Sequence, residues 1–140
     1  MRKVLLLLLA IVPELATATT PNEREVVAAT LILEAGGEYA TGAMEAVMEV
    51  VRNRASKRKL SLRAVCLQKW QFSCWNGADV AAGIAKAKRH PRWDVAMAII
   101  TAPATNFTDG ADHYHTLRVE PYWAQHLEAT VIIGNHIFYK

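Results

Sequence analysis

The residues best suited to acid–base chemistry lie in one stretch, Leu31-Ile32-Leu33-Glu34-Ala35-Gly36-Gly37-Glu38. Glu34 ends an apolar helical run, where the negative end of the helix dipole and apolar neighbours disfavour a charged carboxylate. We therefore expect Glu34 to hold its proton, and the two glycines to let the backbone turn sharply beside a ligand. A protonated carboxylic acid at the edge of a cleft is what glycosidic bond cleavage requires.

Glu38 is the second carboxylate of this stretch, four residues after Glu34. Because Gly36-Gly37 interrupts the helix, we expect Glu38 in the following loop. There it can act as a base or electrostatic partner of the acid, or it can simply form an ion pair or cap the loop. Sequence spacing gives no distance between the two carboxylates, so inverting and retaining geometries both stay open.

A further group of residues has the composition of a sugar-binding site. Amides and hydroxyls pair with sugar hydroxyls and N-acetyl groups, and an aromatic ring stacks on a sugar ring. The candidate substrate-binding residues are Tyr39, Gln71, Ser73, Trp75 and Asn76. Their neighbours Trp70 and Phe72 can instead belong to the core.

The segment Asp112-His113-Tyr114-His115 concentrates other polar groups. On a strand, His113 and His115 project to one face and Tyr114 to the other. With Asp112 they offer ligands that zinc prefers, but no further ligand stands at a suitable spacing and no His-Glu-x-x-His helix is present. We favour histidines that line or underlie a sugar-binding groove; a zinc hydrolase using Asp112, His113 and His115 is the alternative.

The first 18 residues have the pattern of an export signal. A basic start, Met1-Arg2-Lys3, precedes a short apolar run and the cleavage-type sequence Ala16-Thr17-Ala18. The run is far shorter than the ~20 residues of a membrane-spanning helix. We expect cleavage after Ala18 and export to the periplasm, the cell envelope or the medium, without stable membrane insertion; an uncleaved anchor is the alternative.

Two cysteines, Cys66 and Cys74, belong to the mature part of the chain. In an exported protein such a pair predicts a disulfide, here closing a small loop and stabilising the fold by roughly 2–3 kcal/mol; two buried thiols are the alternative.

The charge balance excludes strong electrostatic binding to nucleic acid. The whole chain carries +3, and removal of residues 1–18 leaves 14 basic and 12 acidic residues, a charge of +2. This mild excess suits an anionic envelope polymer but is too small to indicate nucleic-acid binding. Two basic runs, Lys57-Arg58-Lys59 and Lys86-Ala87-Lys88-Arg89, are interpreted as solvated helix ends rather than binding patches.

Hydrophobic periodicity predicts one domain of helices followed by a small sheet. Helices are expected over residues 23–35, 41–57, 62–67, 79–89 and 91–100, a strand over 112–116, a helical turn over 121–124, and a hairpin over 129–139 that turns at Gly134-Asn135. The fold class is therefore α+β, with residues 19–140 forming a single domain.

Several stretches, in order along this domain, resemble the spore-cortex-lytic (SleB-type) cell wall hydrolase family. Glu34-Ala35-Gly36-Gly37-Glu38 and Gln71-Phe72-Ser73 are the most specific matches. The remaining matches are Gly42, Val47, Val50, Asn53-Arg54, Cys66, His113-Tyr114-His115, Pro121-Tyr122-Trp123-Ala124, and Ile133-Gly134, His136 and Phe138-Tyr139.

The resemblance implies a mostly helical, lysozyme-related domain that cleaves the β-1,4 bonds between muramic acid and glucosamine in peptidoglycan, as a glycosidase or lytic transglycosylase. It assigns the acid to Glu34 and cleft roles to Gln71, Ser73, His113 and Tyr114. We expect a monomer that needs no cofactor and whose partner is the glycan strand. A non-catalytic murein-binding envelope protein is the alternative from another functional class.

Overall fold

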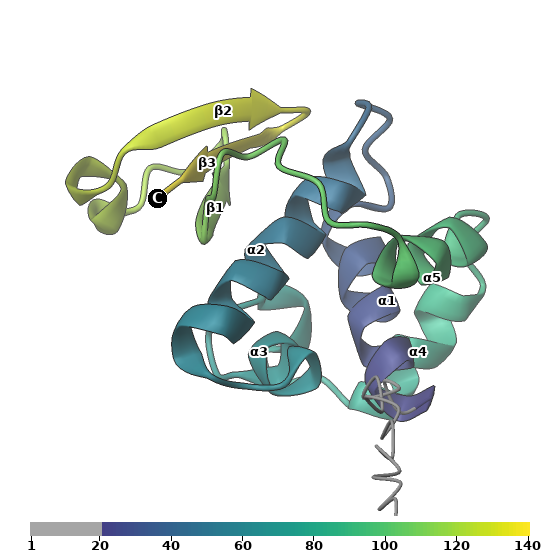
Figure 1. Cartoon of the computed structure of the whole chain (residues 1–140). Coiled ribbons are helices and arrows are strands. Elements are labelled where there is room, and N and C mark those ends of the chain that lie inside the picture. The colour runs from purple at the N-terminus through teal and green to yellow at the C-terminus, as the bar shows by residue number, and fades with distance from the viewer. Residues whose placement is uncertain (1–20) are drawn as a thin grey trace, which may run out of the picture.

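Helix α1 lies at the centre of the fold, and four further helices pack against it (Figure 1). The computed structural model describes residues 21–140, so the predicted signal peptide lies outside the described residues. The helices are α1 (Pro21–Ala35), α2 (Ala43–Arg58), α3 (Leu62–Leu67), α4 (Val80–Lys88) and α5 (Trp93–Thr101). Every side chain from Val26 to Leu31 is fully buried. A helix covered on all sides needs a continuous apolar sequence, and α1 has one.

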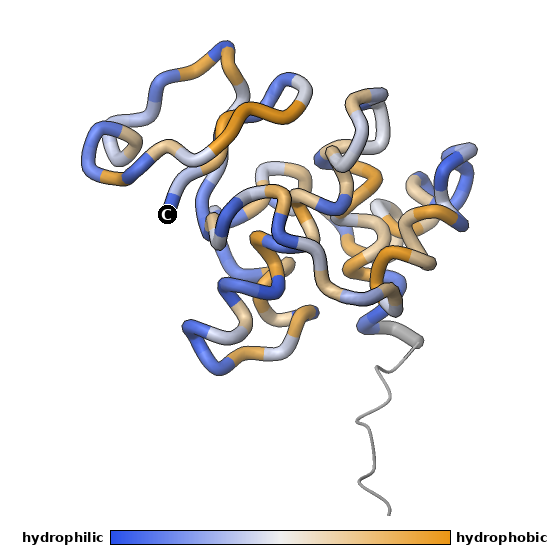
Figure 2. The backbone as a smooth tube through the Cα atoms, turned by 45° about the horizontal axis from the view of Figure 1, so that its top comes forward, coloured by the Kyte–Doolittle hydropathy of each residue, from blue (hydrophilic) through white to orange (hydrophobic). Residues whose placement is uncertain are grey.

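A three-stranded antiparallel sheet forms the second part of the domain. Its strands are β1 (His113–Thr116), β2 (Ala129–Ile133) and β3 (His136–Tyr139), in the order β1-β3-β2. Phe138 is fully buried against Ala46 and Val50, so the sheet packs on α2. Figure 2 shows apolar stretches along the packed helices and the strands, and polar residues mainly at the turns.

The predicted α+β class and the C-terminal hairpin are confirmed. Three predicted helix starts are wrong. The first helix begins at Pro21 rather than at residue 23. The second helix begins after Gly42 rather than Thr41; Gly42 has φ +83°, and a Cβ there would lie 3.0 Å from the Phe107 ring. The fifth begins at Trp93 rather than Pro91, because the amide of Trp93 bonds back to His90 in a turn. Within residues 21–140, no helix combines the length and hydrophobicity needed to cross a bilayer.

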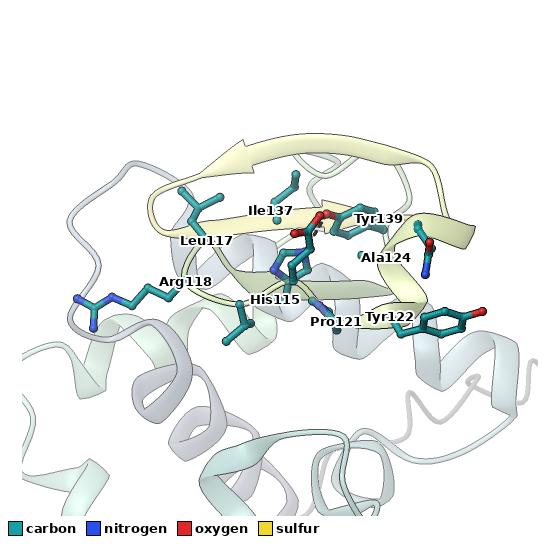
Figure 3. Close-up of a pocket in the computed structure, with 11 residues that line it drawn as sticks. His115, Leu117, Arg118, Pro121, Tyr122, Ala124, Ile137 and Tyr139 are labelled. Carbon is teal, nitrogen blue, oxygen red and sulfur yellow. Dashed lines mark hydrogen bonds between the residues drawn. The ribbon is translucent and has the colours of Figure 1, made fainter.

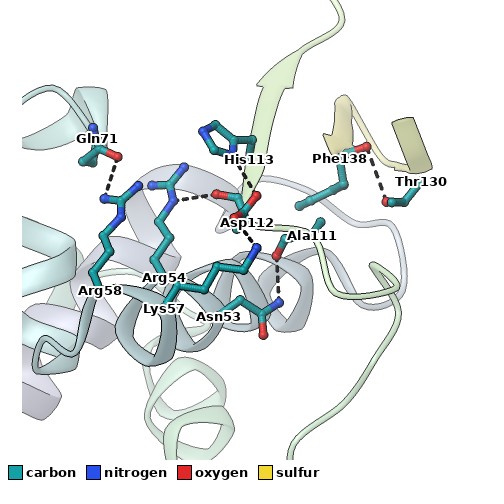
Figure 4. Close-up of polar contacts among 10 residues, drawn as sticks. All are labelled: Asn53, Arg54, Lys57, Arg58, Gln71, Ala111, Asp112, His113, Thr130 and Phe138. Carbon is teal, nitrogen blue, oxygen red and sulfur yellow. Dashed lines mark hydrogen bonds and ion pairs between the residues drawn. The ribbon is translucent and has the colours of Figure 1, made fainter. Parts of the chain in front are cut away.

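Polar side chains of α2 hold the segment that enters β1 (Figure 4). Asn53 Nδ2 donates to the carbonyl oxygen of Ala111 at 2.7 Å, and Arg54 Nε donates to that of Asp112 at 2.6 Å. Lys57 Nζ forms an ion pair with the Asp112 carboxylate at 2.6 Å. Side chains from two successive turns of one helix thereby fix the position of β1 relative to the helices.

Glu49 anchors the loop before β1 from inside the protein. Glu49 lies in the middle of α2, and its residue exposure is only 4%. Its carboxylate accepts hydrogen bonds from the amides of Phe107 and Thr108 at 2.7 and 2.8 Å, and from the hydroxyls of Thr105 and Thr108 at 2.6 and 2.5 Å. A buried charge is tolerated when its acceptor sites are filled in this way.

We expect Glu49→Gln to lower the free energy of unfolding by about 2–4 kcal/mol, because its amide NH2 would face donors that now meet an acceptor. Chemical denaturation measures this effect, and Glu45→Gln on the same helix is the control. Equal stability of the two variants would contradict the anchoring role.

Candidate active site

Glu34 stands in the last turn of α1 and faces β1 and the Gln71–Cys74 loop. Its Oε2 accepts a hydrogen bond from the Tyr114 hydroxyl at 2.6 Å, and its Oε1 accepts a long one from the Cys74 amide at 3.4 Å. The residue is only half-buried. The carboxyl group is therefore held between two donors from distant parts of the chain.

Tyr114 reaches Glu34 because alternate residues of a strand face opposite sides. Its ring packs on Phe138, centroids 5.4 Å apart, and on Phe72 at 6.4 Å. Burial raises the pKa of Tyr114 well above its usual value, and the negative charge of Glu34 raises it further. The phenol therefore keeps its proton and serves as a hydrogen-bond donor.

The Gln71–Cys74 loop is held in place by Phe72. This ring is 1% exposed, and the Arg54 guanidinium lies over it, 5.0 Å from its centroid. Gln71 Oε1 accepts from Arg58 Nη1 at 2.9 Å, which leaves its NH2 group as the part that can meet a ligand, while Ser73 is exposed. Because Phe72 is buried in the core, the residues that follow it run beside Glu34, and the Cys74 amide reaches its carboxylate.

The prediction that Trp75 stacks on a sugar is wrong. Its ring is 9% exposed, and its Nε1 donates to the Thr30 hydroxyl at 2.9 Å inside the core. A Cβ at Gly83 would come within 2.5 Å of the indole, so α4 approaches the ring closely. Tyr39, the other aromatic residue predicted to bind substrate, is 92% exposed and therefore available to a ligand.

Glu38 joins the loop after α1 to the turn between β2 and β3. Its Oε1 lies 3.9 Å from His136 Nδ1, and a Cβ at Gly134 would lie 2.6 Å from its Oε2. Arg92 Nη1 donates to the backbone oxygens of Gly36 and Glu38 at 3.3 and 2.6 Å. These contacts favour a role for Glu38 in shaping the loop.

His136 belongs to the site, although the sequence analysis assigned it no role. It is 5% exposed, and its ring meets Tyr114 edge-on at 5.0 Å. Burial lowers its pKa, against smaller opposing effects of Glu38 and Glu34. A neutral imidazole therefore packs edge-on against the ring of Tyr114. Its place in the Ile133–Tyr139 motif was the only sequence signal for it.

His113 and His115 point away from Tyr114. His113 Nδ1 pairs with Asp112 Oδ1 at 2.7 Å, and His115 bonds the Tyr139 hydroxyl and the Thr116 carbonyl oxygen, both at 2.8 Å. Burial alone would raise the pKa of Asp112, but hydrogen bonds from Lys57 and His113 outweigh it and lower the pKa. The described residues contain no cluster of three potential metal ligands, so the zinc alternative gains no support.

A cavity in the described part of the chain lies on the His115 side of β1. Its volume is about 730 Å³, and His115, Tyr139 and the segment around Pro121 line it (Figure 3). Glu34 is not among its lining residues. This cavity therefore gives no support to the predicted acid–base role of Glu34.

The predicted disulfide is not formed: Cys66 and Cys74 are both free thiols. Burial raises the pKa of Cys66 to about 12. Burial also raises the pKa of Cys74, and the Glu34 carboxylate beside it adds to this effect. Both sulfurs therefore stay protonated, which makes neither a suitable nucleophile.

The chain matches a known protein family. The model of the cell wall hydrolase family matches residues 37–139, most of the chain. The chain belongs to the cell wall hydrolase family. The match starts just after Glu34, so the predicted acid itself lies outside it. The family expected from the motifs is confirmed, and with it an enzyme of the cell wall.

Two solved structures share the fold of this cell wall hydrolase. One is the catalytic domain of the germination-specific lytic transglycosylase SleB from Bacillus anthracis, with a TM-score of 0.67, 19% identity, and coverage of 89% of this chain and 98% of that chain. The other is the catalytic domain of the Bacillus cereus SleB protein, with a TM-score of 0.67, 22% identity, and coverage of 89% and 94%. No curated protein matches the chain.

We expect thiol titration to show two reactive groups per unfolded chain and almost none in the folded protein at pH 8, because both thiols have raised pKa values. The measurement uses Ellman's reagent on protein prepared without reductant, with and without guanidinium, and Cys66→Ser as the one-thiol control. An unfolded chain with no reactive thiol would contradict the free state.

Proposed function

We propose that this cell wall hydrolase degrades peptidoglycan as a lytic transglycosylase, cleaving the β-1,4 bond from N-acetylmuramic acid to N-acetylglucosamine. The observation that carries the proposal is the position of Glu34 between the Tyr114 hydroxyl and the Cys74 amide. Support comes from the likeness to a catalytic domain described as a lytic transglycosylase. The alternative of a non-catalytic binding protein has no observation of its own in its favour.

In the proposed reaction, Glu34 first gives its proton to the glycosidic oxygen. The C1–O bond breaks, the glucosamine side leaves with a new hydroxyl, and positive charge develops at C1 and the ring oxygen. The Tyr114 hydroxyl and the Cys74 amide stabilise the carboxylate that this step creates, because both donate to it.

The second step uses the same carboxylate as a base. The C6 hydroxyl of the muramoyl residue attacks C1 and releases its proton to Glu34, which closes a 1,6-anhydro ring and restores the acid. These two steps need only one carboxylate, whereas hydrolysis with retention needs two carboxylates beside the scissile bond. The contacts of Glu38 with His136 and the Gly134 turn fit a supporting role in such a one-carboxylate mechanism.

Substrate contacts are proposed for Tyr39, Gln71 and Ser73. Ser73 and Tyr39 are exposed, and the NH2 group of Gln71 can donate to a sugar hydroxyl or acetamido oxygen. Because the proposed substrate lies outside the cytoplasmic membrane, the proposal includes export, for which the pattern of residues 1–18 is the support.

We expect Glu34→Gln to lower the rate of product release from purified peptidoglycan by at least ~100-fold, because the amide keeps the shape but supplies no proton. Soluble products are separated and weighed by mass spectrometry; anhydro ends are lighter than reducing ends by one water. Glu45→Gln is the control. Near wild-type turnover by Glu34→Gln would refute the acid, reducing ends would refute the transglycosylase, and binding without release would establish the non-catalytic alternative.

We expect Tyr114→Phe to lower kcat by roughly 10- to 100-fold with little change in KM, because one hydrogen bond to a charged group is lost where charge develops. Steady-state kinetics on soluble glycan strands measure this, and thermal unfolding checks the fold. Tyr122→Phe, which removes an exposed hydroxyl elsewhere, is the control. Unchanged kcat in Tyr114→Phe would remove the tyrosine from the mechanism.

A further inference from the structure

The basic run Lys86-Ala87-Lys88-Arg89, interpreted from sequence as a solvated helix end, borders a pocket in the structure. The pocket measures about 400 Å³ and lies between the end of α1, the loop after it and the α4–α5 turn. We call it the α1–α4 pocket; its lining residues are Ile32, Leu33, Gly37, Lys86, Ala87, Arg89, His90 and Pro91. None of these eight is acidic, and three of them are basic.

Of the three basic residues in the Lys86–Arg89 run, two line the pocket and one does not. Lys88 is turned aside by an ion pair with Glu25 on α1. Lys86 and Arg89 line the pocket, and Arg89 Nη1 also donates to the carbonyl oxygen of Ala85 at 3.2 Å, which leaves its other N–H groups for a ligand. The Arg92 amide donates to His90 Nδ1 at 3.2 Å, so the proton of the neutral imidazole is on Nε2, which is a donor. The α1–α4 pocket thus offers an ammonium, a guanidinium and an imidazole N–H.

The remaining wall of the α1–α4 pocket is apolar. Ile32, Leu33, Ala87 and Pro91 supply it. A site that combines cationic donors with aliphatic surface suits an amino-acid carboxylate, which has a charged end beside a small apolar side chain. A phosphodiester polymer with hydroxylated links would gain little from the aliphatic wall.

The pocket is joined to the active-site loop. Gly37, one of its lining residues, lies in the loop that follows α1, three residues after Glu34. Arg92, from the turn that carries His90, donates to the backbone oxygens of Gly36 and Glu38. A ligand in the pocket therefore touches the loop that carries Glu38 and that directly follows the helix end with Glu34.

We infer that the α1–α4 pocket binds a free carboxylate of the peptide stem attached to the glycan strand. The inference rests on the proposed function, because only a peptidoglycan substrate brings such a peptide to this place. The pocket then contributes substrate affinity, and the chemistry at Glu34 is unchanged when it is empty.

The test compares two forms of the same soluble glycan strands: one with intact stems, and one whose stems an N-acetylmuramoyl-L-alanine amidase has removed. For Lys86→Gln/Arg89→Gln, we expect KM on stem-bearing strands to rise about three- to ten-fold with unchanged kcat, as for the loss of two partly exposed ion pairs. On stripped strands the double variant should match the wild type.

The control is Lys59→Gln/Arg63→Gln, which removes the same charge from exposed positions near α3 and should change neither KM. The single variant Lys86→Glu repeats the test if the double variant is unstable. An equal KM rise on both strand forms, no rise on either, or the same rise in the control overturns the inference.

Poly(glycerol phosphate) added as a competitor provides a further arm. If it inhibits the wild type but not the double variant, while stems make no difference to KM, the pocket binds phosphodiester and the peptide assignment is wrong. Failure of the proposed function has a separate signature: the wild type then releases no anhydro products from either strand form.

Discussion

The hydrogen bond between Tyr114 and Glu34 joins the two parts of this domain at the point where chemistry is proposed. One partner ends the central helix and the other belongs to an edge strand, 80 positions apart in sequence. A bond to a carboxylate weakens quickly when its length or angle changes. The helices and the sheet must therefore keep a fixed relative position, and much of the polar structure serves to maintain it.

Helix α2 carries the side chains that keep the sheet in place relative to the helices. Asn53, Arg54 and Lys57 hold the segment before Tyr114 from one side, and the buried carboxylate of Glu49 holds the preceding loop. None of these groups is itself a substrate contact proposed here. Glu49 and Arg54 are buried, which makes their bonds costly to lose, because an unpaired polar group inside the protein has no water to replace its partner.

The surroundings of Glu34 also explain why neighbouring reactive groups stay inert. Two thiols near the carboxylate keep their protons through burial and, for Cys74, through the negative charge beside it. His136 stays neutral for the same reason of burial and presents its ring edge to Tyr114. The site thus contains one carboxyl group open to acid–base work among groups that position it.

The sequence by itself determined the helices and the hairpin, and it predicted Glu34 as the acid. Apolar periodicity, Ser61 and Asp79 as helix caps, and the Gly134 turn are local signals, and local signals survive in the unfolded chain. Only the tertiary structure decided which side chains meet. It buried Trp75 against Gly83, left the cysteines unpaired, and brought His136 to the site. Such contacts depend on the relative placement of elements distant in sequence, which no spacing along one segment encodes.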